Sequence, residues 1–250
     1  MSEQKVAVKE VRQDLPQCWK DVETALNAGV DRVILFGPPG TGKTFAGLNY
    51  GDVKAGAFRL ICTEDMSNAQ VEGHYKMNGE GGWSWKDGQA VSAWKGDGIV
   101  GGRLVIDEID KAGADVFATL LAFTDSPESA KWESPENGRT ITPKDGFSVV
   151  MTTNIETMDE LPEALKDRFP VAIRINQPHP DALLALSADL REYAVRMADA
   201  GENRISLRTF YAFDKLRKSV GDTESARIIF GNKAEGFLDA IRINLIAVAK

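Results

Sequence analysis

The chain has 250 residues, of which 43% are apolar and 27% charged, a composition typical of a soluble globular protein and not of a disordered one. Its formal net charge is −7, and the acidic excess lies in the first 180 residues, so a broad nucleic-acid-binding surface is not expected. The longest apolar stretches are about five residues, far below the ~20 that a membrane-spanning helix needs.

The N-terminus and the two cysteines favour a cytoplasmic location. Residues 1–6 contain no basic region followed by an apolar core, so we expect no export signal. Cys18 and Cys62 match neither a metal-binding spacing nor a disulfide framework. Two ordinary thiols are typical of a protein in a reducing compartment.

An N-terminal helix is expected over residues 19–28, ending at Gly29. Short apolar runs with helical segments between them then predict a parallel sheet that is covered on both faces. The expected strands are residues 32–36, 57–62, 103–106, 147–151 and 171–175.

Two segments interrupt this alternation. Residues 79–102 hold eight of the 23 glycines and three tryptophans, and the alternating pattern of 83–91 predicts a hairpin that turns at Asp87 and Gly88. Residues 131–146 predict a second hairpin with its turn at 135–138. Whether the glycine- and tryptophan-rich segment lines a pore stays open at this point.

The pattern changes again near residue 178. Leu183, Leu186, Leu190 and Tyr193 are spaced by three or four residues, which predicts an amphipathic helix. We therefore expect an N-terminal helical segment at 1–28, an α/β domain at 29–178 and a small all-helical domain at 179–250.

A phosphate-binding loop follows the first expected strand and opens a helix, in the pattern G-x-x-x-x-G-K-[ST]. Backbone N–H groups of such a loop turn inward around phosphates. We expect Lys43 to reach the β- and γ-phosphates and Thr44 to ligate Mg²⁺. The loop consists of Gly37, Pro38, Pro39, Gly40, Thr41, Gly42, Lys43 and Thr44.

Two carboxylates follow the third expected strand. Asp107, at the strand end, suits a magnesium contact through water, and Glu108 suits a general base that activates a water molecule. A solvated acidic turn is the alternative for this pair, and the presence of the phosphate loop favours the catalytic interpretation.

Asn154 and Arg168 are further candidates. Asn154 follows the fourth expected strand and is placed to orient an attacking water, although an asparagine there also suits a turn cap. Arg168 ends a short expected helix over 161–169, where it can reach a neighbouring subunit's nucleotide or complement its own helix dipole. The sequence leaves both pairs of alternatives open.

Together these motifs, over about residues 30–215, resemble an AAA+ ATPase of the helix-2-insert group, which includes MoxR-type, CbbQ-type and dynein-like modules. The resemblance implies that Asn154 is the sensor-1 residue, Arg168 the arginine finger and Arg208 the sensor-2 arginine. Two departures stand out: Asp110 and Lys111 take the place of the usual Asn-Arg after Asp-Glu-Ile, and Leu207 stands where many relatives have proline. No GTP-type signature follows Asn154, which favours ATP.

By this resemblance the fold is a P-loop doubly wound parallel sheet with a small C-terminal helical lid, and the cofactors are ATP and Mg²⁺. It further implies a homo-oligomeric, generally hexameric ring that remodels a protein partner, in the manner of MoxR- and CbbQ-type chaperones, often with a von Willebrand factor A-type partner. Two alternatives remain: an ATP-driven nucleic-acid motor or loader, which the acidic charge disfavours, and a non-hydrolysing nucleotide switch, which Glu108 and Arg168 disfavour.

Overall fold

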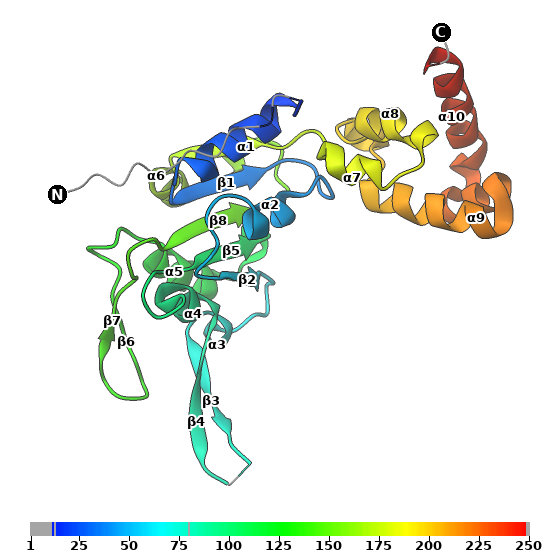
Figure 1. The fold of residues 1–250 in the computed structure, drawn as a ribbon. Helices are drawn as coiled ribbons and strands as arrows, with labels where there is room; N and C mark the ends of the chain where they lie inside the picture. The colour runs from blue at the N-terminus through cyan, green and yellow to red at the C-terminus, as the bar shows by residue number, and fades with distance from the viewer. Residues whose placement is uncertain (1–11, 13, 80, 249–250) are drawn as a thin grey trace. The chain divides into compact units, whose positions relative to one another are not determined.

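The computed structural model describes residues 12, 14–79 and 81–248 (Figure 1). The expectation for residues 1–6, and most of the first half of the expected segment 1–28, lie outside the described residues. The described chain forms two compact units. One contains residues 20–37 and 43–174, and the other contains residues 14–19, 38–42 and 175–248.

The first unit is built on a five-stranded parallel sheet with the strand order β2-β5-β8-β1-β9. All five expected strands are present, with ends that differ by at most one residue, which confirms the predicted α/β fold. β1 and β5 are buried at every position, as a central parallel strand requires. The strands are β1 (Arg32–Phe36), β2 (Ala57–Ile61), β5 (Arg103–Asp107), β8 (Ser148–Thr152) and β9 (Val171–Arg174).

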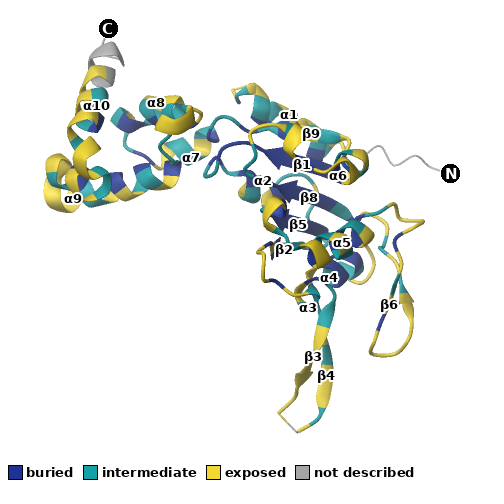
Figure 2. Cartoon of the chain, turned by 180° about the vertical axis from the view of Figure 1, so that it is seen from behind, coloured by how far each residue is buried: buried dark blue, intermediate teal, exposed yellow. Residues whose placement is uncertain are grey.

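Helices cover both faces of this sheet. Leu104, Ile106 and Met151 point into an apolar core that they share with helices α3 to α6. On the opposite face helix α2 packs so closely that a Cβ added to Gly47 would lie 3.1 Å from Val105. Figure 2 shows the three inner strands, β1, β5 and β8, as the most deeply buried part of the sheet. The helices are α1 (Gln17–Asn27), α2 (Lys43–Asn49), α3 (Asn68–Val71), α4 (Gln89–Lys95), α5 (Ala114–Phe123) and α6 (Glu163–Arg168), with 3₁₀ turns η1 (Ile109–Lys111) and η2 (Met158–Glu160).

The hairpin expected over residues 83–91 is wrong, because residues 89–91 begin helix α4, and the hairpin present here uses a different pair of strands. β3 (Gly73–Met77) pairs antiparallel with β4 (Trp83–Asp87), so the chain turns over residues 78–82. Gly88 instead precedes helix α4 as its N-cap, with an extended backbone at φ −77° and ψ 179°. A type I′ turn at Asp87 and Gly88 would need positive φ at both residues, which this conformation excludes.

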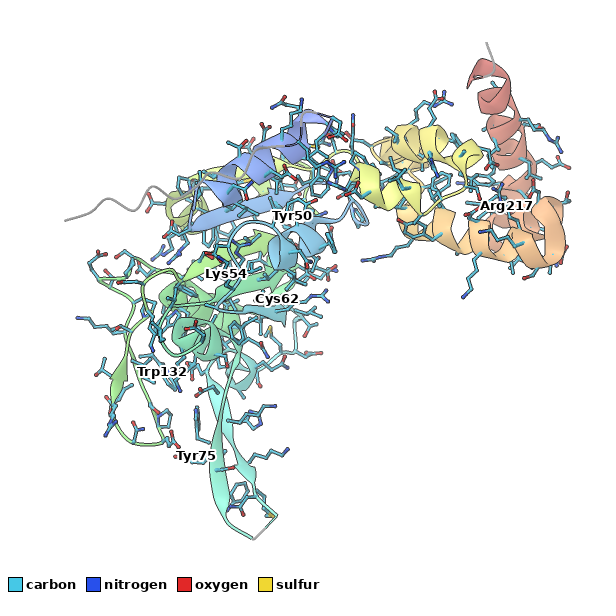
Figure 3. The ribbon with its side chains drawn as sticks, in the orientation of Figure 1. Tyr50, Lys54, Cys62, Tyr75, Trp132 and Arg217 are labelled. Carbon is cyan, nitrogen blue, oxygen red and sulfur yellow. The ribbon has the colours of Figure 1, made fainter. Side chains whose placement is uncertain are left out.

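The second expected hairpin, with its turn at 135–138, is confirmed. β6 (Trp132–Glu133) pairs antiparallel with β7 (Thr140–Ile141). Both hairpins extend from the same side of the unit (Figures 1 and 2) and touch each other. The Tyr75 hydroxyl donates to the Pro135 carbonyl at 2.9 Å, and the rings of Trp85 and Trp132 lie 6.0 Å apart (Figure 3).

The C-terminal part of the second unit is all helical, as predicted. The single amphipathic helix expected through Leu183, Leu186, Leu190 and Tyr193 is wrong, because the chain leaves the helix after Leu184 and begins a new one after its N-cap, Ser187. The core of this part contains Leu186, Leu190 and Phe210. Helix α9 is two helices joined at Gly221, where φ is 79°. The elements are α7 (Pro180–Leu184), α8 (Ala188–Met197), α9 (Leu207–Phe230) and α10 (Ala234–Val248), with 3₁₀ turns η3 (Gly201–Asn203) and η4 (Gly231–Lys233). Among the described residues no helix is long and apolar enough to cross a membrane.

Candidate nucleotide site

The carboxyl ends of β1, β5 and β8 meet at one edge of the sheet, because the three strands are parallel neighbours. β1 ends at the phosphate loop, β5 ends at Asp107 and β8 leads into Asn154. Polar side chains from three distant parts of the sequence therefore lie together at this edge.

Asn154 joins the lysine of the phosphate loop to the carboxylate that follows β5. The Lys43 ammonium donates to Asn154 Oδ1 at 3.1 Å, and Asn154 Nδ2 donates to Glu108 Oε1 at 3.3 Å. Lys43 is buried and also donates to the Gly37 carbonyl at 2.7 Å. The amide thus fixes the positions of a cation and a carboxylate that lie far apart in the chain.

Asp107 is buried, and hydrogen-bond donors surround its carboxylate. Oδ1 accepts from the hydroxyls of Thr44, at 2.7 Å, and Thr152. Oδ2 accepts from Nε of Arg59, at 3.2 Å, and from Nη2 of the same guanidinium. Burial by itself would raise the pKa of Asp107, but the hydrogen bonds from Thr152, Arg59 and Thr44 outweigh it and hold this pKa below its usual value.

Glu108 has a strained backbone. Its φ of 57° and ψ of 49° are left-handed, and it is the only non-glycine residue with positive φ in the described part of the chain. Such strain persists only where the surroundings enforce it, and it is common at functional sites. Here the Glu108 N–H contacts the Thr152 hydroxyl at 3.4 Å, and Oε2 accepts from the Lys111 ammonium at 2.8 Å. Lys111, which departs from the family pattern, is therefore the cation beside Glu108.

Two further residues, Thr153 and Cys62, lie close to the carboxylates that follow β5. The Thr153 hydroxyl donates to Asp110 at 2.6 Å, which ties β8 to the turn after β5. Cys62 is buried after β2 (Figure 3), and burial together with the charges of Asp107, Asp110 and Glu108 raises the pKa of its thiol to about 12. The thiol therefore stays protonated and acts as an apolar side chain.

The middle of the phosphate loop belongs to the second compact unit. There a Cβ added to Gly40 would lie 3.4 Å from Cβ of Ser206, the N-cap of α9, and one added to Gly42 would lie 3.4 Å from the Trp19 ring. Both glycines have positive φ, at 81° and 109°. The Thr41 hydroxyl closes the loop on the Pro38 carbonyl at 3.1 Å. Since 3.4 Å is an ordinary contact distance, the positive φ values, and not crowding, favour glycine at positions 40 and 42.

Arg168 lies in the same unit as this cluster but apart from it, whereas Arg208 belongs to the second unit. Arg168 ends α6, three residues before β9 begins, and donates to the Ala164 carbonyl and to Asp125. Because it lies near the amino end of a parallel strand, it is at the sheet edge opposite to Lys43. Arg208 is exposed in the first turn of α9, and within the described residues its side chain makes no hydrogen bond or ion pair.

Two residues that contact the predicted site residues were not predicted from the sequence: Arg59, which binds Asp107, and Asp125, which binds Arg168. Arg59 lies in the middle of the β2 apolar run, and its partner Asp107 is 48 residues away. A lone charge inside a predicted buried strand is the signal that would have identified it. Asp125, after α5, has no such signal, because an acidic residue following a helix is common at protein surfaces.

A family model and two solved structures are similar to this chain. The model of the AAA domain, dynein-related subfamily, matches residues 32–169. Among solved structures, NtrX from Brucella abortus is 12% identical, with a TM-score of 0.53, over 81% of this chain and 51% of that chain. A candidate ATPase from Cytophaga hutchinsonii is 18% identical, with a TM-score of 0.46, over 84% of this chain and 59% of that chain. The chain thus spans less than two thirds of either structure, and no curated protein matches it.

Proposed function

Since the chain belongs to the dynein-related subfamily of AAA domains, we propose that it binds ATP with Mg²⁺ and hydrolyses it. The observation that carries the proposal is the Asn154 amide between Lys43 and Glu108. A phosphate-binding cation, a polar water-positioning group and a carboxylate base are the parts that hydrolysis of a phosphoanhydride needs, and here they are linked.

The donor set fits Mg²⁺ and a nucleotide. The Thr44 hydroxyl and the Asp107 carboxylate lie 2.7 Å apart, and magnesium prefers such oxygen ligands while keeping several of its waters. We propose that Thr44 ligates the ion directly and that Asp107 holds it through water. Bound there, Mg²⁺ neutralises charge on the phosphate oxygens. Gly37 to Thr44 would hold the phosphates through backbone N–H groups.

Each remaining residue of the cluster has a proposed task. Lys43 attracts the β- and γ-phosphates, and its buried ammonium is held in place by the Gly37 carbonyl. Glu108 accepts the proton of the attacking water, and the hydrogen bond from Asn154 fixes the carboxylate that does so. Its hydrogen bond to Glu108 supports a second task for Asn154, which is to orient that water.

The position of Arg168 supports a role in a neighbouring copy. The five-residue strands separate the two sheet edges by about 17 Å. Arg168 lies near the edge opposite to Lys43, so it is far from the phosphate loop of its own chain. We propose that it reaches the γ-phosphate bound by an adjacent subunit of a hexameric ring, and that Arg208 acts as a second sensor.

The biological role is a further part of the proposal. Residues 29–178 would be the nucleotide-binding domain and residues 179–250 its helical lid, with 1–28 as an N-terminal helical segment. The ring would remodel a protein partner in the cytoplasm, as MoxR- and CbbQ-type chaperones do, with a partner of the von Willebrand factor A type. The net charge of −7 supports a protein partner over nucleic acid.

Two measurements test the proposal. Steady-state ATP hydrolysis with and without Mg²⁺, combined with light scattering for the mass of the assembly, should give magnesium-dependent turnover by an oligomer. No turnover by an assembled ring would instead support the non-hydrolysing switch. Strong stimulation by DNA or RNA, with sub-micromolar and steeply salt-dependent binding, would support the motor alternative.

A further inference from the structure

Arg59 is the cation that neutralises Asp107 in this structure. Its Nε lies 3.2 Å from Asp107 Oδ2, and its Nη2 donates to the same oxygen. Thr44 and Thr152 occupy Oδ1 of that carboxylate. Both carboxylate oxygens are thus engaged, and of their partners only Arg59 carries a charge.

The place of Arg59 allows it to leave. It projects from β2, the edge strand of the sheet, and its side chain is 44% exposed. Within the described residues Asp107 is the sole hydrogen-bond or ion-pair partner of the Arg59 guanidinium. Breaking the contact would therefore release the guanidinium into water. Apart from Asp107, no described group would lose a hydrogen bond from the Arg59 side chain.

The same carboxylate is the one proposed to hold hydrated Mg²⁺. Water molecules of the ion need the lone pairs of Asp107 that Arg59 now occupies. Two cations beside one carboxylate also repel each other, since like charges at short range disfavour one another in a partly buried site. Arg59 and the ion therefore compete for Asp107.

We infer that Arg59 is a competing counter-cation that sets the affinity of the site for the divalent ion. Ion binding displaces the guanidinium from Asp107, and loss of the ion lets it return. Arg59 is thus a positioning residue that acts through Asp107. The inference rests on the proposed function, because it assumes that Asp107 holds Mg²⁺ beside a nucleotide.

Calorimetry with ADP tests this without any turnover. The ADP dissociation constant is measured in EDTA and in excess MgCl₂. The constant in EDTA divided by the constant in MgCl₂ reports how strongly the ion strengthens ADP binding. In Arg59→Gln this ratio should rise about fivefold, the size expected for release of a partly exposed ion pair. Arg59→Lys keeps the charge but loses the two-point contact, so its ratio should fall between those of Arg59→Gln and the wild type.

Two further variants make the test specific. Lys95→Gln removes the cation of an ion pair of similar exposure in the same unit, with Asp87 at 2.6 Å, and should leave the ratio unchanged. In an Asp107→Asn background Arg59→Gln should no longer raise the ratio, because the shared carboxylate is gone. Melting temperatures measured by circular dichroism verify that each variant is folded.

The possible failures are distinguishable. If ADP binds and Mg²⁺ strengthens its binding through Asp107, but Arg59→Gln gives a ratio equal to or below that of the wild type, the inference is wrong and the proposed function stands. If the folded wild-type protein does not bind ADP, both are wrong.

Discussion

Arg168 and Asp125 form an ion pair within one chain, with Arg168 Nη2 lying 3.5 Å from Asp125 Oδ2. The same guanidinium donates to the Ala164 carbonyl at 3.1 Å, and its side chain is only 28% exposed. Asp125 in turn lies beside Arg32, which donates to the Asp125 carbonyl at 3.1 Å. The proposed finger is therefore held in a defined position by its own subunit before any neighbour is involved.

The phosphate loop gives the first prediction. Lys43→Ala should weaken ATP binding by at least tenfold, because it removes the buried cation proposed to face the β- and γ-phosphates. Calorimetric titration with ATP and MgCl₂ measures the loss. Lys54→Ala, which removes an exposed lysine of the same unit, is the control. An unchanged affinity in Lys43→Ala would show that the loop does not bind nucleotide.

Glu108 gives the second prediction. Glu108→Gln should bind ATP normally and hydrolyse it 10²- to 10⁴-fold more slowly, because the amide cannot accept the proton of the water. Single-turnover hydrolysis measures the rate, and calorimetry verifies binding. Glu64→Gln, which changes an exposed glutamate in the loop after β2, should keep the wild-type rate. Near-normal turnover by Glu108→Gln would move the base to another group, with Asp110 as the next candidate.

The helical unit gives a prediction about acid stability. Arg217 of α9 (Figure 3) donates to both carboxylate oxygens of Asp189, at 2.6 and 2.8 Å, and to Asp214 at 3.0 Å. The bond from Arg217 lowers the pKa of Asp189. Burial opposes ionisation of Asp214, but bonds from Ser187 and the charge of Arg217 still lower its pKa. The contribution of these two carboxylates to the free energy of unfolding is therefore fully present above about pH 4. It is lost as the pH falls through their lowered pKa values.

Asp189→Asn tests this relationship. The variant should lose about 2 kcal/mol of unfolding free energy at pH 7, the usual contribution of charge-assisted hydrogen bonds, and its stability should fall less below pH 4. Urea unfolding followed by circular dichroism at the two pH values measures both effects. Asp239→Asn, which breaks the exposed pair with Arg242, should cost less than about 0.5 kcal/mol. Equal losses in the two variants would refute the argument.

The strands of the sheet were predictable because each is a short apolar run that ends in polar or glycine-rich residues. The hairpin turn at Asp87 and Gly88 was not, because local turn chemistry competes with packing. A Cβ at Gly88 would lie 2.4 Å from the Val71 carbonyl, so close approach to α3 explains this glycine. The true turn is held by Asn78, whose side chain accepts from the Gly82 N–H at 2.7 Å.

The candidate site was predictable only in part, for a similar reason. Lys43, Thr44, Asp107 and Glu108 lie in two local motifs whose spacing points to phosphate chemistry, and Asn154 was a candidate because it follows an expected strand. The contact of Arg59 with Asp107 depends on the pairing of β2 with β5, which no local pattern encodes. Residues that act through such long-range contacts become visible only when the sheet order is known.

The position of Arg168 leads to the last prediction, which concerns two subunits. Arg168→Ala keeps an intact phosphate loop, and Lys43→Ala keeps an intact finger, so each variant alone should be inactive. In a mixed ring some interfaces join an intact loop to an intact finger, and partial ATP hydrolysis should return. A guanidinium that stabilises the transferring phosphoryl group contributes 10³- to 10⁵-fold in rate, so even a few such interfaces are measurable.

The controls separate a role in the neighbouring subunit from a structural one. Arg168→Ala should bind ATP with nearly wild-type affinity, since the finger acts mainly in the transition state. Mixing Arg168→Ala with Glu108→Gln should also restore activity, because the two defects lie on opposite edges of the sheet. Mixing Lys43→Ala with Glu108→Gln should restore no activity. Both residues belong to the subunit that binds the nucleotide, so every active site in the mixed ring would lack one of them. If mixed rings form and the first two mixtures stay inactive, Arg168 does not act across a subunit boundary, and its bonds to Ala164 and Asp125 describe a helix-terminal residue.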